Sequence, residues 1–136
     1  MVEFIVPGKP QGKARPRLAR NGHTYTPRDT VEYENRVVRA YLRKYDEVSF
    51  RPEESLSVTI EAVFEPPASV SQVRRARMIH GEYPTKKPDL DNICKAIMDA
   101  MNGVVYPDDK QVVAVSMKKV YGDTAGVAVT VERIEK

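Results

Sequence analysis

The chain has 136 residues, of which 41% are hydrophobic and 30% are charged, and its formal net charge is +3 at pH 7. This length suits one domain, and the hydrophobic fraction is ample for a packed core, which excludes a disordered chain. No apolar run approaches the roughly 18 residues of a membrane span. The N-terminus also lacks a signal-peptide pattern, so we expect a cytoplasmic protein with no membrane contact.

The N-terminal part of the chain predicts a strand, a basic hairpin and a helix in succession. Val2 to Val6 form the expected strand, which Pro7-Gly8 ends. Asn21-Gly22 then predicts the tight turn of an irregular hairpin. Residues 26–45 carry apolar positions at helical spacing, and Thr26 is the expected N-cap, with proline at the first helical position.

The remainder of the chain alternates between strand and helix patterns. Residues 56–64 are rich in β-branched side chains and predict a strand, and residues 69–81 predict a short basic helix. After a central helix, residues 110–121 and 126–134 predict two strands joined by a turn. This order predicts an α+β fold, a two-layer sandwich in which helices pack on a mixed, mostly antiparallel sheet within a single domain over residues 1–136.

Basic residues are concentrated in two parts of the chain. Between Gly8 and Arg28 there are six Lys or Arg residues and no acid, and a second group before the central helix is opposed only by Glu82. Such clusters suit a phosphate backbone, although solvated surface charge explains them as well. The residues we expect at DNA are Lys9, Lys13, Arg15, Arg17, Arg20, Arg74, Arg75, Lys86 and Lys87.

Residues 87–113, KPDLDNICKAIMDAMNGVVYPDDKQVV, gather acidic side chains around the central helix. Asp89 or Asp91 is its candidate N-cap, and Gly103 is the residue expected just past its end. Lys95 lies one helical turn after Asp91. Capping and turn chemistry would explain D-L-D and P-D-D without any catalytic role. The alternative is a metal site, which requires the P-D-D segment to fold back toward the start of the helix.

Such a site would suit Mg²⁺, a hard cation that takes oxygen ligands and keeps several waters. Adjacent residues of an extended segment face opposite sides, so at most one of Asp108 and Asp109 should reach it easily. Lys95 could then neutralise charge on a reacting phosphate. The segment GKPQGKA, starting at Gly8, lacks the spacing and the Ser or Thr of a P-loop, so we expect no nucleotide cofactor.

The same 27 residues closely resemble the signature of the RusA family of Holliday-junction resolvases, which are small metal-dependent endonucleases. The resemblance rests on D-L-D-N, a lysine in the next turn, an Asp eight residues on and the later D-D-x-Q-V. Residues 8–27 also look like phage and prophage members. The resemblance implies metal binding by Asp89, Asp91 and Asp109, with Asp108 as a further candidate, and catalysis by these aspartates with Lys95.

It further implies Mg²⁺, with Mn²⁺ as a substitute, and paired nicks of opposing strands in four-way or branched DNA. A homodimer is also implied, and physics supports it, because a junction with near two-fold symmetry needs two symmetric cuts and one chain carries one acidic set. Two alternatives stay open. One is a non-catalytic branched-DNA-binding protein of the same fold, and the other is an interaction domain whose carboxylates only cap and turn.

Overall fold

A four-stranded mixed sheet forms the centre of the computed structural model, which describes all 136 residues. Its strands, in spatial order, are β1 (Val2–Pro7), β6 (Gly126–Arg133), β4 (Leu56–Phe64) and β5 (Val112–Tyr121). β6 pairs antiparallel with both β1 and β4, whereas β4 and β5 are parallel. The expected α+β class and the mixed, mostly antiparallel sheet are therefore confirmed.

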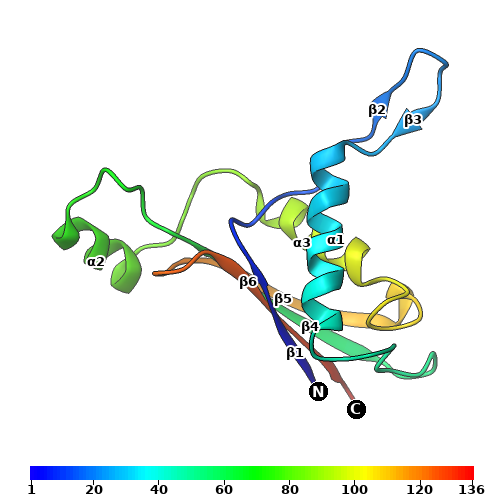
Figure 1. The fold of residues 1–136 in the computed structure, drawn as a ribbon. Coiled ribbons are helices and arrows are strands. Elements are labelled where there is room, and N and C mark those ends of the chain that lie inside the picture. Colours follow the sequence, from blue (N-terminus) through cyan, green and yellow to red (C-terminus); the bar gives the residue numbers. More distant parts are fainter.

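Helices α1 (Arg28–Leu42) and α3 (Leu90–Met101) pack together and share one buried core with the sheet (Figure 1). Alternate residues of β4, from Leu56 to Phe64, are buried in this core, as the period of a half-buried strand requires. Ile93 and Ile97 bring the apolar side of α3 to the same core, where both are fully buried. No helix has the length and apolar character needed to cross a bilayer.

Two arms extend from this body on different sides (Figure 1). The hairpin arm consists of β2 (Arg17–Leu18) and β3 (Thr24–Tyr25), which pair antiparallel around a turn in which Gly22 has a φ of 83°. The helical arm is α2 (Gln72–Gly81), which begins where the Ser71 side chain accepts a hydrogen bond from the Arg74 backbone N–H. Both arms present basic side chains away from the core.

Helix α1 begins later than its sequence suggests. Thr26 was the expected N-cap, but Pro27 occupies that position with extended backbone, at a ψ of 146°, and no side chain caps the helix. The Pro27 carbonyl instead accepts the N–H groups of Thr30 and Val31, at 3.1 and 3.2 Å. The prediction of Thr26 as N-cap is therefore wrong, because the helical turn closes on the proline carbonyl.

Strands β5 and β6 are consecutive in sequence but are not neighbours in the sheet. β4 lies between them and pairs with both. The connecting turn crosses the end of β4, where the Gly122 N–H donates to the Phe64 carbonyl at 2.9 Å. The order places β5 at one edge of the sheet, and the chain leading into β5 carries the P-D-D segment.

Truncating Ile97 to alanine should lower the free energy of unfolding by about 2–5 kcal/mol, because Ile97 is fully buried on α3 and would leave a cavity. Chemical denaturation measures this loss. Val113→Ala is the control, since 63% of Val113 is exposed, and it should change stability by less than about 0.5 kcal/mol. Equal losses in the two variants would contradict the packing of α3 described above.

Candidate active site

The first two aspartates lie where the chain enters α3. Asp89 is the N-cap residue and has extended backbone, with φ −67° and ψ 148°, but its side chain makes no capping hydrogen bond. The Asp91 carboxylate, in the first turn, accepts a hydrogen bond from the Asn92 backbone N–H at 3.0 Å. Both side chains are exposed. Capping therefore does not account for the Asp89 carboxylate, which is available to a ligand.

The next turns of α3 carry a free lysine and a paired aspartate. Lys95 is exposed and forms no ion pair. The Asp99 carboxylate lies 3.2 Å from the Lys13 ammonium, which is also 2.5 Å from the Glu34 carboxylate on α1. Asp99 thus helps to join the N-terminal segment to both helices, while Lys95 is left free toward solvent.

Lys13 was expected at DNA, and the structure places it inward, with 18% of its side chain exposed. Burial lowers the pKa of Lys13, but the hydrogen bonds and charges of Glu34 and Asp99 outweigh this effect and leave the pKa raised. The ammonium is therefore charged and already compensated by two carboxylates. Its contact with DNA stays a prediction, whereas its bridging role is visible.

The aspartates of P-D-D are used differently from each other. Asp108 caps the 3₁₀ turn η1 (Asp109–Gln111), where its carboxylate accepts from the Lys110 backbone N–H at 3.0 Å. The Asp109 backbone N–H donates to Asn102 Oδ1 at 3.0 Å, which fixes it beside the end of α3. The Asp109 carboxylate itself accepts no hydrogen bond. Asp108 is thus explained by turn structure, and Asp109 is not.

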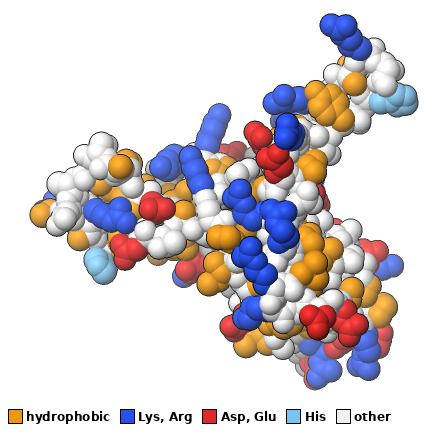
Figure 2. Space-filling model, in the orientation of Figure 1, with side chains coloured by type: hydrophobic (Ala, Val, Ile, Leu, Met, Phe, Trp, Pro, Cys, Tyr) orange, Lys and Arg blue, Asp and Glu red, His pale blue; other side chains and the backbone are white.

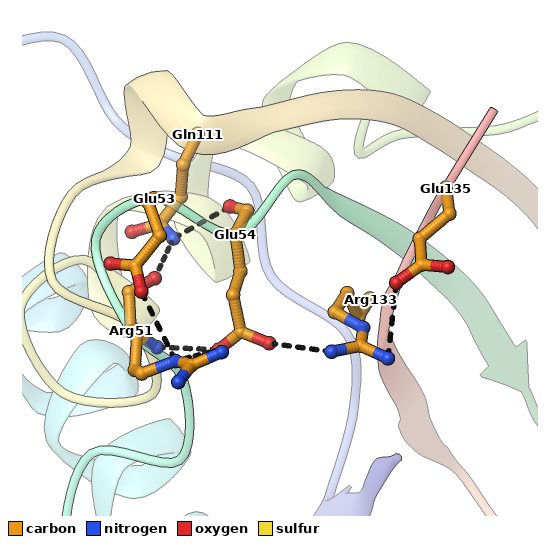
Figure 3. A network of polar contacts seen from close by, with 6 residues as sticks. All are labelled: Arg51, Glu53, Glu54, Gln111, Arg133 and Glu135. Carbon is orange, nitrogen blue, oxygen red and sulfur yellow. Dashed lines mark hydrogen bonds and ion pairs between the residues drawn. The ribbon is translucent and has the colours of Figure 1, made fainter.

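A buried amide holds this segment in place (Figure 3). Gln111 is 8% exposed, and its Nε2 donates to the carbonyls of Arg51 and Glu54 at 2.8 and 2.9 Å, while its Oε1 accepts from the Asp108 N–H. The Glu54 carboxylate in turn lies 3.7 Å from the Arg133 guanidinium on β6. The glutamine of D-D-x-Q-V therefore fixes the backbone that carries both aspartates.

The structure does not bring the acids of the two motifs together in a preformed cage. No three His, Cys, Asp or Glu side chains are grouped so that they could hold one metal ion. The 12 residues of α3 span about 18 Å, with Asp89 at one end and the Asp109 backbone anchored at the other. The expected return of P-D-D to the start of the helix is therefore not seen in the backbone.

Two groups, one in α3 and one packed against it, are affected by the nearby acids. Tyr106 is fully buried and its hydroxyl contacts Met98 Sδ at 3.7 Å. Burial raises the pKa of the Tyr106 phenol above its usual range, and the negative charges of Asp109, Cys94 and Asp99 act in the same direction. Burial, followed by the Asp91 charge, likewise raises the pKa of Cys94. Asp91 therefore acts on Cys94, and Asp99 and Asp109 act on Tyr106.

The basic residues expected at DNA occupy three places. Arg17 and Arg20 lie on the hairpin arm, and both are exposed. Lys9, Arg15, Lys86 and Lys87 are exposed around the start of α3 and form no ion pairs. On the helical arm, Arg74 pairs with Glu82, and Arg75 lies 3.5 Å from Asp123. Figure 2 shows Lys and Arg side chains over α1 and in the notch between the two arms.

Sequence reasoning missed a lysine that supports the entrance to α3. The Lys119 ammonium on β5 donates to the carbonyls of Lys86 and Pro88, at 2.5 and 3.0 Å, just before Asp89. The alternation of side chains along β5 could have revealed Lys119. It pairs with buried Ala62 and therefore lies on the face of β5 that is turned toward the core. A charged residue at such a position requires polar partners, which these carbonyls supply.

The family model described as endodeoxyribonuclease RusA matches residues 7–132, nearly the whole chain. The chain belongs to the RusA family. Membership covers the N-terminal segment, α3 and the P-D-D segment together, and it supports nuclease activity on DNA. Uncharacterized protein YqaN of Bacillus subtilis (strain 168) is similar to this RusA-family chain, with 29% identity over 137 residues that cover 98% of this chain and 96% of the relative. That name states no activity.

Gln111→Ala should lower the free energy of unfolding by roughly 2 kcal/mol, because two loop carbonyls and the Asp108 N–H lose their buried partner. Thermal unfolding followed by circular dichroism measures the effect. Lys110→Ala is the matched control, since the neighbouring Lys110 side chain is exposed. Indistinguishable melting temperatures for the two variants would show that Gln111 does not fix this segment.

Proposed function

We propose that this protein is a metal-dependent endodeoxyribonuclease that resolves Holliday junctions and related branched DNA by paired phosphodiester hydrolysis on opposing strands. The observation that carries the proposal is the family match over residues 7–132, which includes every acidic residue of D-L-D-N and P-D-D. The carboxylates of Asp89 and Asp109 also support the proposal, because neither one caps a helix or accepts a hydrogen bond within the chain.

The donor set suits a hard divalent cation. Asp89, Asp91 and Asp109 would hold Mg²⁺, or Mn²⁺ in its place, with oxygen donors alone. Magnesium sites commonly use one or two carboxylates together with waters and substrate phosphate oxygens, so a closed cage of three carboxylates is not a requirement. When bound, such an ion polarises a phosphate and lowers the pKa of bound water.

The chain's own residues would position the DNA and balance its charge. Lys95 is exposed, unpaired and one turn beyond Asp91, so its ammonium is free to approach a phosphate at the start of α3. A positive group there would stabilise negative charge that develops on the phosphate during hydrolysis. The exposed lysines that precede α3, Lys86 and Lys87, would hold the adjoining backbone.

A homodimer follows from the substrate. A four-way junction has near two-fold symmetry, and resolution needs a cut on each of two opposing strands. One chain has one set of candidate acids, in D-L-D-N and P-D-D, so a pair of chains related by a two-fold axis would supply two equivalent sites.

The second candidate is a branched-DNA-binding protein of the same fold that does not cleave. The separation of Asp89 from the Asp109 backbone along α3 favours this alternative. Both candidates require DNA binding, so turnover is the property that separates them.

Asp91→Asn should abolish nicking of a labelled four-way junction while junction binding stays within about threefold of wild type, because the change removes a charge and preserves the shape of the side chain. Asp46→Asn is the matched control. Asp46 lies on the loop after α1, where its carboxylate is exposed and forms no ion pair. Gel analysis of products and of retarded complexes measures both properties. Wild-type nicking by the Asp91 variant would disprove the role of Asp91.

Removing divalent metal with a chelator should stop nicking but leave retardation of the junction, because the basic residues do not depend on metal. Adding Mg²⁺ or Mn²⁺ should restore paired nicks on opposing strands. Retardation without any product at saturating Mg²⁺ would favour the non-cleaving DNA-binding protein instead.

A further inference from the structure

A cleft of about 690 Å³ lies between the N-terminal segment and the first turns of α1. Lys9, Gln11, Thr30, Tyr33, Arg36 and Lys87 are among the residues that line it. A second hollow of about 540 Å³ shares Gly12, Lys87 and Pro88 with it and extends to Asp89 and Asn92. The two hollows therefore lie side by side, and together they extend from Arg36 to the acidic start of α3.

Positive charge exceeds negative charge in the lining of the cleft. Lys9, Arg36 and Lys87 form no ion pairs. Of the two acids at its edge, Glu32 is already paired with Arg28 at 2.9 Å, and Asp29 is exposed. An anion in the cleft would thus meet three cations and one unpaired carboxylate, and the adjoining hollow that reaches Asp89 suits a chain of linked anions.

Arg36 is held in place within the cleft rather than free in solvent. Its guanidinium lies 5.8 Å from the centre of the Tyr33 ring. A β-carbon added at Gly8, where φ is +95°, would come within 2.8 Å of Arg36 Nη1. The side chain is thus confined between the backbone at Gly8 and an aromatic ring, which fixes the direction of its donors at low entropic cost.

The Tyr33 hydroxyl provides an independent indication of a ligand. Tyr33 is 2% exposed, and its hydroxyl is buried. The Gln11 backbone N–H faces the hydroxyl oxygen, but the hydroxyl's own proton has no acceptor within the chain. Leaving such a group unpaired costs about 1–3 kcal/mol, so a partner from outside the chain would recover this cost. Burial raises the pKa of Tyr33 to about 12, against the opposing effects of the Gln11 backbone and Arg36, so the hydroxyl keeps its proton and can donate it.

We propose that this cleft binds a backbone phosphate of the DNA strand adjacent to the phosphate that is cut, with Arg36 and the Tyr33 hydroxyl as its donors. The proposal rests on the proposed nuclease function. Lys9 and Lys87 add charge at the mouth of the cleft, and the connected hollow leads the strand to Asp89. Arg36 and Tyr33 are positioning residues, because they hold the strand in register and do not touch the reacting atoms.

The test compares Arg36→Ala with Arg39→Ala, which removes an exposed arginine from the same helix outside the cleft. Junction binding is measured without divalent metal over a range of salt concentrations. Arg36→Ala should weaken binding about tenfold and reduce the slope of log K against log salt by about 0.9, the value for one lost phosphate contact. Arg36→Lys should regain most of the slope but less of the affinity, because lysine lacks the bidentate fork. Arg39→Ala should change neither quantity appreciably.

Tyr33→Phe adds a readout that a purely structural role would not give. It should weaken junction binding several-fold at an unchanged salt slope, while the melting temperature stays close to the wild-type value, because the proton that is removed has no acceptor within the chain. A lower melting temperature with unchanged binding would show that the hydroxyl serves the fold, and would overturn its assignment.

Equal binding and equal salt slopes in Arg36→Ala and Arg39→Ala would also overturn the proposal while leaving the nuclease function intact. If the wild-type protein binds the junction, loses affinity on Arg36→Ala and cuts no DNA, the nuclease function is disproved and the phosphate subsite is retained. Inorganic phosphate, titrated alone by NMR, separates a free anion from a DNA strand. Tight binding of phosphate at Arg36, with junction affinity unaffected by Arg36→Ala, would point to a free anion and overturn the DNA assignment.

Discussion

The bridge made by Lys13 is the interaction on which the arrangement of the site depends. Its ammonium joins Glu34 of α1 to Asp99 of α3, and its backbone N–H donates to the Asn92 carbonyl at 2.9 Å. A side chain with so little solvent access needs a carboxylate partner, and losing either Glu34 or Asp99 would release one of the two helices from the bridge. The N-terminal segment is thereby held against both helices, and the entrance to α3 gains a fixed neighbour.

Close packing reinforces this bridge and shapes the surface around it. A β-carbon at Gly12 would lie 3.0 Å from the Asn92 Cβ and 3.1 Å from the Pro88 Cβ, so the segment approaches α3 as closely as a residue without a side chain allows. On the other side of the same entrance, Lys119 holds the Lys86 and Pro88 carbonyls. Asp89 therefore projects from a backbone that is fixed on two sides, with the cleft and its connected hollow beside it.

Local sequence patterns predicted most of the helices and strands, whereas features that depend on long-range pairing were not predicted. Strand alternation in residues 56–64 and the helical spacing after Pro88 depend on near neighbours in sequence, and the structure has both elements there. The insertion of β4 between β5 and β6 depends on partners far apart in sequence, which no local period encodes. The same limit explains Lys13 and Tyr33. A basic run predicts positive surface, but only the fold shows that Lys13 faces two acids and that Tyr33, with its buried hydroxyl, lines a cleft.

The candidate site could be predicted from the sequence only in part. D-L-D-N at a helix start places Asp89 and Asp91 at one end of α3 in both prediction and structure, whereas the position of Asp109 depends on Asn102 and Gln111. Burial first, and then the nearby acids, raise the pKa of Tyr106 and of Cys94, so both groups stay neutral beside the aspartates. Lys95 is the one cation of α3, and it pairs with none of them. Asp99 is balanced by Lys13 and Asp108 caps a turn, whereas the carboxylates of Asp89 and Asp109 have no partner in the fold. Their place in the chain is therefore explained by what they would bind rather than by what they stabilise.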